Sequence, residues 1–195
     1  MKYTPKIEKA IKTATSAHDG QYRKAYKNPR LPYVSHLFSV ASIISEHTDD
    51  EDIIIAGLLH DILEDTDFEA TLLLQEFGQR VHELVDCVTE ATKKEKETTT
   101  WKEEKENYLR KLRNGPREAS IIASADKIHN LLATIDSKIL VTRNPEEYIW
   151  YHREVFAIIS DKLGDHPIVE KHKNAMTEAG KTYRDRVVHE ASSMV

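Results

Sequence analysis

The sequence predicts an all-α protein, and three observations lead to this fold class. Apolar residues recur at the helical period through each long segment of the chain. Only six glycines and six prolines interrupt these segments. No stretch shows the alternation of apolar and polar residues that a half-buried strand requires. Because the expected helices differ in length and their loops are uneven, we expect a compact multi-helix bundle that is not a simple up-and-down arrangement.

The first half of the chain is expected to contain five helices. A proline stands near the start of the first helix, where its fixed backbone angle suits a helix, and Gly78 breaks the chain before the last. The polar, basic and proline-bearing stretch over residues 20–33 is expected to be a loop. The predicted helices span residues 5–19, 34–48, 50–65, 68–75 and 78–91.

The second half begins with TKKEKETTT, residues 92–100, which has no apolar face and is predicted to be a mobile loop. The charged helix that follows ends at an Asn-Gly-Pro sequence, and the next helix contains the apolar stretch IIASA. A loop is expected over residues 141–146, and the polar C-terminus is expected to form a helix with a frayed end. The predicted helices of this half span residues 101–113, 117–136, 146–163 and 166 onward.

Composition narrows the class of protein. A chain of 195 residues is long enough for one domain with a single core. Its net charge of −5 argues against a nucleic-acid binder but not against an anionic small-molecule ligand. No apolar run approaches the roughly 20 residues that cross a bilayer, and the N-terminus has no apolar signal core. Cys87 is the only cysteine and lies in an apolar pattern, so we expect a buried thiol, no disulfide framework and a cytoplasmic protein.

The stretch GLLHDILEDT, residues 57–66, places a histidine and three carboxylates beside an apolar run. His60 and Asp61 are neighbours, and Glu64 and Asp65 follow one helical turn later. Adjacent side chains reach one point if that point lies between them near the end of a helix, and a metal ion is such a point. The alternative is a solvated acidic face beside a histidine of the core.

Two other segments favour the metal. His36 lies on an otherwise apolar helix, where a lone histidine is more often a packed core residue. Asp126 lies in the most apolar helix of the second half, and a buried carboxylate without a partner costs several kcal/mol or becomes protonated. A divalent cation would remove that cost. Three helices would then supply four nitrogen and oxygen ligands, a set that suits a six-coordinate divalent ion with open positions.

The order of these residues resembles the signature of the HD superfamily of metal-dependent phosphohydrolases. Five stretches read in order, AHDGQYRK, LPYVSHLFSVA, AGLLHDILEDT, FGQRVHELVDCVTE and ADKIHNL, are similar to the hydrolase domain of the RelA/SpoT proteins. They are most similar to its stand-alone form, the small (Mesh1-like) alarmone hydrolases. The similarity spans roughly residues 10–165 and implies one HD-type domain over 1–195, with a helical tail over 166–195. The synthetase domain of the bifunctional enzymes would need about a further domain's length, so we expect a chain that only hydrolyses.

The resemblance implies a mechanism and a set of ligands. His36, His60, Asp61 and Asp126 would hold one metal ion, usually Mn²⁺ in this family, although ligands of this type also suit other divalent metals. The substrate would be guanosine tetra- or pentaphosphate, cut at the 3′ ester to release pyrophosphate. The Glu64–Asp65 pair would orient the attacking water or carry a proton, and the sequence does not divide these roles between the two residues.

Four further residues match positions that bind the nucleotide in the family. Arg23 and Lys24 match a basic pair near the base and phosphates, and the alternative is two solvated loop cations. Asn130 matches a residue that contacts the ribose, and Tyr148 matches a substrate-side tyrosine in a less specific region, where a core aromatic is the alternative. We expect a structural role for His129 and ordinary roles for the remaining histidines.

The sequence departs from the family pattern at three places. Leu37 stands where proline often follows the first metal-binding histidine, and Leu132 replaces an arginine on the substrate side. The segment around residues 92–105 is longer and richer in lysine than expected. Its lysines would either close over phosphates or be solvated, and we favour solvated lysines.

Two other functions compete with alarmone hydrolysis. The same site in an HD domain could act on another nucleotide, such as the 2′-phosphate of NADPH or a nucleoside monophosphate. A degenerate HD fold could instead serve as a nucleotide sensor or scaffold. The loop GQYRK together with the EDT sequence favours alarmone hydrolysis over the first alternative, and the presence of all six ligand and acidic positions argues against the second.

Overall fold

The computed structural model describes residues 1–24, 26, 29–137 and 145–193. Within these ranges every regular element is a helix, and the β contact found there is an isolated bridge between Tyr22 and Pro32. The predicted all-α fold is therefore confirmed. The loop predicted over residues 141–146 lies largely outside the described residues.

Local sequence explains where several helices begin. The hydroxyl of Thr4 accepts a hydrogen bond from the backbone N–H of Ile7, and a proline follows it at the first helical position. The carboxylate of Asp50 accepts from two backbone N–H groups of the next helix. The helices are α1 (Pro5–Ala17), α2 (Val34–Ser45), α3 (Glu51–Leu59), α4 (Ile62–Asp65), α5 (Ala70–Phe77), α6 (Gln79–Val88), α7 (Lys93–Lys96), α8 (Trp101–Asn114), α9 (Arg117–Ser137), α10 (Pro145–Leu163) and α11 (Pro167–Ser193).

The prediction of an unstructured loop over residues 92–100 is wrong in part, because α7 lies within it. Thr92 and Glu95 form a capping box, in which each side chain bonds the backbone N–H of the other residue. Four satisfied backbone and side-chain groups stabilise a single turn that has no apolar face. Periodicity could not reveal this helix, since the signal lies in its cap.

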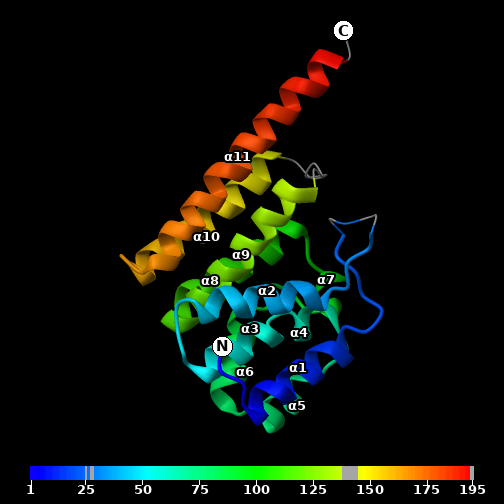
Figure 1. Cartoon of the computed structure of the whole chain (residues 1–195), viewed down its shortest axis with the longest axis vertical. Coiled ribbons are helices and arrows are strands. Elements are labelled where there is room, and N and C mark those ends of the chain that lie inside the picture. Colours follow the sequence, from blue (N-terminus) through cyan, green and yellow to red (C-terminus); the bar gives the residue numbers. More distant parts are fainter. Residues whose placement is uncertain (25, 27–28, 138–144, 194–195) are drawn as a thin grey trace.

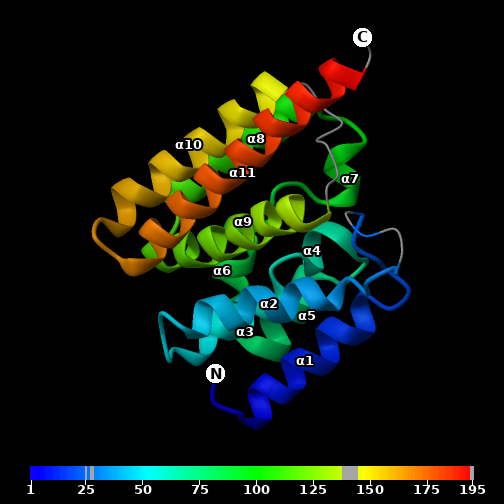
Figure 2. The ribbon, with the colours of Figure 1, turned by 45° about the horizontal axis from the view of Figure 1, so that its top comes forward.

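The helix α9 runs through the middle of the molecule (Figure 2). It packs against α2 and α3 on one side and against α10 and α11 on the other, and it also contacts α6. Its residues Ile121, Ile122 and Ile128 are buried in the core. The C-terminal helix α11 starts beside α9 and extends away from the body of the protein (Figure 1). Side chains on α9 can therefore reach groups on several other helices.

Two glycines shape the half of the protein that contains α2 and α3. Gly78 adopts a φ of 91°, in the left-handed region, at the break between α5 and α6, as the sequence predicts. Gly57 lets α2 approach α3 closely, because a Cβ atom at this position would collide with the side chain of Ile44. The close approach brings the start of α2 next to the end of α3. No helix within the described ranges has the length and apolar character needed to cross a membrane.

The contact between α9 and α11 contains a buried histidine that should make stability depend on pH. The ring of His172 on α11 is fully buried, and its Nδ1 lies 3.2 Å from Ser124 Oγ in a hydrogen bond. Burial, with a smaller contribution from Lys127, lowers the pKa of His172 to about 4. Burial lowers the pKa of the neighbouring His152 in the same way, to about 3. Both rings are therefore neutral in the folded protein near pH 7.

We predict that His172 lowers the free energy of unfolding as the pH falls. An unfolded histidine binds a proton near pH 6.5, whereas folded His172 does not until about pH 4, so the stability it contributes is present above pH 6.5 and is lost as the pH falls through this window. From pH 7 to pH 5 the free energy of unfolding should fall by about 2 kcal/mol through this residue alone. Urea unfolding of metal-free protein at both pH values measures the difference, and His172→Gln should reduce it. An equal difference in both proteins would contradict the assignment.

Candidate metal centre

The segment predicted as one helix over residues 50–65 is two helices, and the break lies at His60 and Asp61. The carbonyl of Gly57 accepts a hydrogen bond of 2.8 Å from Nδ1 of His60, one turn further along the chain. Asp61 adopts φ −95° and ψ 0°, outside the regular helical region. The chain then resumes as α4, with N–H groups of Glu64 and Asp65 bonding the Asp61 carbonyl. This break turns two adjacent side chains toward the same point.

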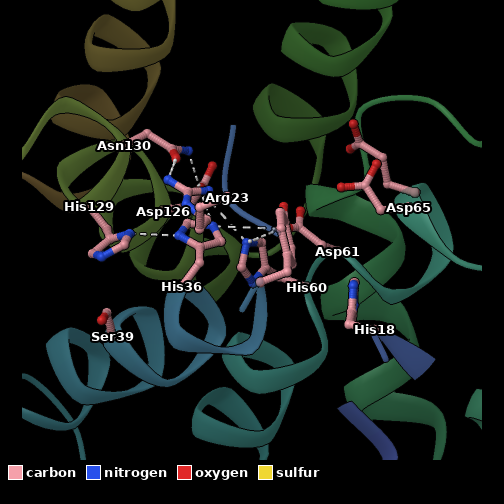
Figure 3. A network of polar contacts seen from close by, with 12 residues as sticks. His18, Arg23, His36, Ser39, His60, Asp61, Asp65, Asp126, His129 and Asn130 are labelled. Atoms are coloured by element: carbon pink, nitrogen blue, oxygen red, sulfur yellow. Dashed lines mark hydrogen bonds and ion pairs between the residues drawn. The ribbon is translucent and has the colours of Figure 1, made fainter. Parts of the chain in front are cut away.

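Four side chains from three helical regions meet at that point (Figure 3). Nε2 of His36, on α2, lies 3.2 Å from Oδ1 of Asp126, on α9, and 3.5 Å from Oδ2 of Asp61. Nε2 of His60 lies 3.0 Å from the same Asp61 oxygen and 3.7 Å from the same Asp126 oxygen. The structure thus brings together the four residues that the sequence predicts as metal ligands.

The hydrogen bonds of the two imidazoles leave one nitrogen of each available as a ligand. Because a carbonyl oxygen can only accept, the Nδ1 of His60 carries the proton, and its buried Nε2 has no hydrogen-bond partner in the described part of the protein. Nδ1 of His36 lies 2.7 Å from Nδ1 of His129. Burial, followed by the nearby His36, lowers the pKa of His129 to about 4, so this ring is neutral and can accept the proton of His36 Nδ1. Both Nε2 lone pairs then face the shared point.

The two carboxylates are held in their charged form. Burial alone would raise the pKa of Asp126, but the ammonium of Lys127 and the contacts with His36 and His60 hold that pKa well below its ordinary value. Burial raises the pKa of Asp61, but the adjacent His60 and His36 together outweigh burial, so this pKa is lowered too. The hydroxyl of Tyr33 donates to Asp61 Oδ2 at 2.6 Å. Anionic ligands are therefore present near neutral pH.

The arrangement fits a divalent metal ion. Metal–ligand distances of about 2.0–2.2 Å place neighbouring ligand atoms about 3.0–3.5 Å apart. The four measured separations, 3.0–3.7 Å, lie close to this range. An unpartnered, buried imidazole nitrogen between two carboxylates is also what a missing cation would leave behind.

The acidic pair lies one turn beyond the ligands, on α4, and it meets a lysine. Nζ of Lys96 lies 2.9 Å from Oε1 of Glu64 and 3.7 Å from Oδ1 of Asp65. The other carboxylate oxygen of Glu64 accepts from the backbone N–H of Glu90 at 3.0 Å. The preference for solvated lysines over residues 92–105 does not hold for Lys96, because its ammonium pairs with both members of the acidic pair. Their catalytic roles stay predictions.

Of the four predicted nucleotide-binding residues, two lie beside the predicted ligands. Arg23 donates to Oδ1 of Asn130 at 2.8 Å, and Nδ2 of Asn130 donates to Asp126 Oδ1 at 2.6 Å, so both lie at the edge of the metal centre (Figure 3). Lys24 is exposed. Tyr148 is partly buried on α10, with its ring centroid 4.3 Å from that of His152. Their roles toward a nucleotide stay predictions.

Sequence reasoning missed several residues of the centre. Tyr33 and Lys127 each contact a predicted ligand directly, and His129, for which a structural role is expected, bonds His36. All three stand next to or three residues from a predicted ligand in the chain, so proximity in sequence was the available signal. His18 is buried, and its ring stacks on that of Tyr33 with centroids 5.1 Å apart. A structural role is expected for His129 and an ordinary role for His18, and their contacts with His36 and Tyr33 agree with these expectations.

Comparison with known proteins gives a family and several relatives. The profile of the HD domain family matches residues 10–165. A Haemophilus influenzae protein named guanosine-3′,5′-bis(diphosphate) 3′-pyrophosphohydrolase is 36% identical over 120 residues, which is 60% of this chain and 17% of that protein. A Streptomyces coelicolor GTP pyrophosphokinase is 31% identical over 158 residues, 81% of this chain and 18% of that protein. This chain thus corresponds to less than a fifth of the length of either relative.

A solved structure has a similar fold over nearly its whole length. It is described as a metazoan ortholog of SpoT that hydrolyses ppGpp and plays a role in starvation responses. The TM-score is 0.71 at 25% sequence identity, and the match covers 95% of this chain and 98% of that one. The all-α architecture is therefore shared with a chain of nearly the same extent.

We predict that a divalent metal stabilises the protein through His60. A ligand that binds only the folded state, at a free concentration of about 100 times its Kd, adds about 2.7 kcal/mol to the free energy of unfolding. EDTA-treated protein should therefore gain about this much when Mn²⁺ is added, and His60→Ala should gain little. Chemical unfolding with and without Mn²⁺ measures both values. His82→Ala, on α6, serves as the control, and a full gain in His60→Ala would remove His60 from the site.

Proposed function

The chain belongs to the HD domain family, and we propose that it hydrolyses guanosine 3′,5′-bis(diphosphate) and the corresponding pentaphosphate at the 3′ ester. The products would be pyrophosphate and GDP or GTP. The observation that carries this proposal is the meeting of His36, His60, Asp61 and Asp126 one turn from a pair of carboxylates. The names of the relatives and the description of the similar solved structure support the same substrate.

We further propose that the resident metal is Mn²⁺. The ligands supply nitrogen and oxygen atoms and no sulfur, which suits manganese among other divalent ions. Such an ion, when bound, supplies a Lewis acid that activates water and offsets charge on the attacked phosphate. The four ligands would fix its place. Lys127 holds Oδ2 of Asp126 so that Oδ1 faces inward, and Tyr33 donates to Oδ2 of Asp61, the oxygen that also faces the two histidines.

Glu64 is the proposed proton carrier of the site. Burial and the charge of Asp61 raise the pKa of this carboxyl, with Lys96 opposing them. A carboxyl group whose pKa moves toward neutrality exchanges protons more effectively at the pH of the reaction. Its Oε2 is fixed by a backbone N–H, which leaves the side chain a single orientation. Asp65, more exposed and beside the same lysine, would orient the attacking water.

The nucleotide is proposed to enter over Arg23 and Asn130. Arg23 lies on the loop before α2, and its guanidinium is linked through Asn130 to the metal ligand Asp126. A guanidinium in this position can pair with a phosphate or stack on a purine. Lys24 and Tyr148 would complete the site, and we propose a nucleotide and no nucleic acid as the partner, in line with the net charge of −5.

The extent and location of the enzyme are also proposals. A single domain over residues 1–195 is supported by the position of α9, which contacts helices from both halves of the chain. The HD motifs occupy residues 10–165, and α11 forms most of the remainder. Cys87 is free and buried, which agrees with the reducing cytoplasm.

The first test is pyrophosphate release from ppGpp by purified, Mn²⁺-loaded protein. We predict metal-dependent release, and a fall in kcat of about 10²–10⁴-fold in Glu64→Gln, since this change removes the proton carrier. Mn²⁺ affinity should stay within a few-fold of the wild type in this variant. Glu83→Gln, an exposed change on α6, should keep full activity.

The outcomes of this test distinguish an error in the role of Glu64 from an error in the substrate. Wild-type kcat in Glu64→Gln would rule out Glu64 as the proton carrier. No release by folded, Mn²⁺-loaded wild type would rule out ppGpp, and NADPH and nucleoside monophosphates would then be assayed in its place.

We predict that Arg23→Ala raises KM for ppGpp by about tenfold or more with a smaller change in kcat. The reason is that a charge-assisted hydrogen bond to phosphate contributes about 1.5–3 kcal/mol, and tenfold corresponds to about 1.4 kcal/mol. The matched control is Arg30→Ala on the same loop, because Arg30 is exposed and its guanidinium lies 3.7 Å from the centroid of the Tyr22 ring. Equal effects on KM in both variants would indicate general electrostatic attraction and no specific contact by Arg23.

A further inference from the structure

One carboxylate outside the metal centre collects contacts from three helices. Glu90 follows α6, and its side chain is 14% exposed. Its Oε1 accepts from Nζ of Lys127, on α9, at 2.9 Å and from the hydroxyl of Tyr151, on α10. Its Oε2 accepts from Nζ of Lys105, on α8. A carboxylate with three donors from three helices has little freedom to move.

The lysine on α9 connects this carboxylate to the metal centre. Nζ of Lys127 also donates to Oδ2 of Asp126 at 2.9 Å, so one ammonium bridges Glu90 and a proposed metal ligand. Lys127 is only 6% exposed, and its Nζ lies 5.3 Å from the ring centroids of both Tyr108 and Tyr151. A buried ammonium needs a full counter-charge nearby, and Glu90 supplies it.

The backbone of the same residue reaches the acidic pair. The N–H of Glu90 donates to Oε2 of Glu64, the carboxylate proposed to carry the proton. Glu90 therefore contacts the catalytic carboxylate through its main chain and the metal ligand through Lys127.

We propose that Glu90 is a positioning residue, which holds the Lys127 ammonium on Asp126 Oδ2 and fixes Glu64 through its backbone N–H. Asp126 then offers only Oδ1 to the metal, and its charge is not cancelled by an unpaired ammonium. The inference rests on the metal centre of the proposed function and deepens it, but it does not depend on which nucleotide is the substrate.

The positive charge of Lys127 determines the direction in which the loss of Glu90 changes metal affinity. Without the carboxylate of Glu90, the positive charge of Lys127 is balanced by Asp126 alone, so it offsets the charge of a proposed metal ligand, and the ammonium is free to pull Asp126 away. Both changes weaken metal binding. If Glu90 acts through Lys127, its removal should matter much less once the ammonium is gone, so the two substitutions should not be additive.

The experiment measures Mn²⁺ affinity by calorimetry in Glu90→Gln, Lys127→Met and the double variant. Glu90→Gln keeps the size and one oxygen acceptor, and we expect a loss of about tenfold or more in affinity. In the Lys127→Met background the same change should cost threefold or less. Glu83→Gln serves as the matched surface control and should bind Mn²⁺ as the wild type does. At saturating Mn²⁺, Glu90→Gln should also lower kcat for ppGpp more than it changes KM.

Circular dichroism and chemical unfolding establish that each variant is folded. If Glu90→Gln is not, Tyr151→Phe takes its place, since it removes one donor to Glu90 and should weaken Mn²⁺ binding by a smaller factor. Unchanged Mn²⁺ affinity in a folded Glu90 variant, or an equal loss with and without Lys127, would overturn the proposal. Because the affinity measurements use the metal alone, failure of ppGpp as a substrate leaves them intact.

Discussion

The burial of two carboxylates between α2, α4 and α9 is the constraint on which the rest of this structure depends. An isolated charge in an apolar core costs several kcal/mol, and Asp61 and Asp126, whose side chains are 15% and 13% exposed, lie at the edge of one. Asp126 is compensated at its outward oxygen, Oδ2, by the ammonium of Lys127, and Asp61 accepts the hydroxyl of Tyr33 at the same Oδ2 that faces the histidines. The two imidazoles stand at the inward side. Carboxylate oxygens of both aspartates and the Nε2 atoms of both histidines thus converge on one point that could hold a cation.

The helix α9 is able to serve both the core and the centre because much of its length is packed between other helices. Its isoleucines contact the helices around it, while four nearly consecutive polar residues point in different directions. Asp126 faces the ligands, Lys127 turns to Glu90, His129 bonds His36, and Asn130 bonds Arg23. On an exposed helix, polar residues at these positions would contact water. Here each meets a side chain from another element, so the centre is built by packing.

The fold class, most helices and the meeting of the four proposed ligands could be predicted from sequence, because periodicity and ligand chemistry are local signals. The break at His60 could not, since it depends on a side chain bonding the carbonyl of Gly57 in place of the helical N–H. The helix α7 was missed because its signal is a capping box on a polar segment. Lys127 was missed for another reason. Neighbours on a helix do not face each other, and its bond to Asp126 exists because Glu90 holds the ammonium from the far side.

The two carboxylate oxygens of Asp126 contact different parts of the site. Its Oδ1 faces the two histidines and accepts from Asn130, which leads to Arg23 and the side proposed for the nucleotide. Its Oδ2 accepts from Lys127, which leads through Glu90 to Glu64 and the proposed proton carrier. A displacement of this one carboxylate would therefore reach metal, substrate and proton transfer together. Contacts on both oxygens restrict its rotation, and this explains why so many charged groups are buried around a single aspartate.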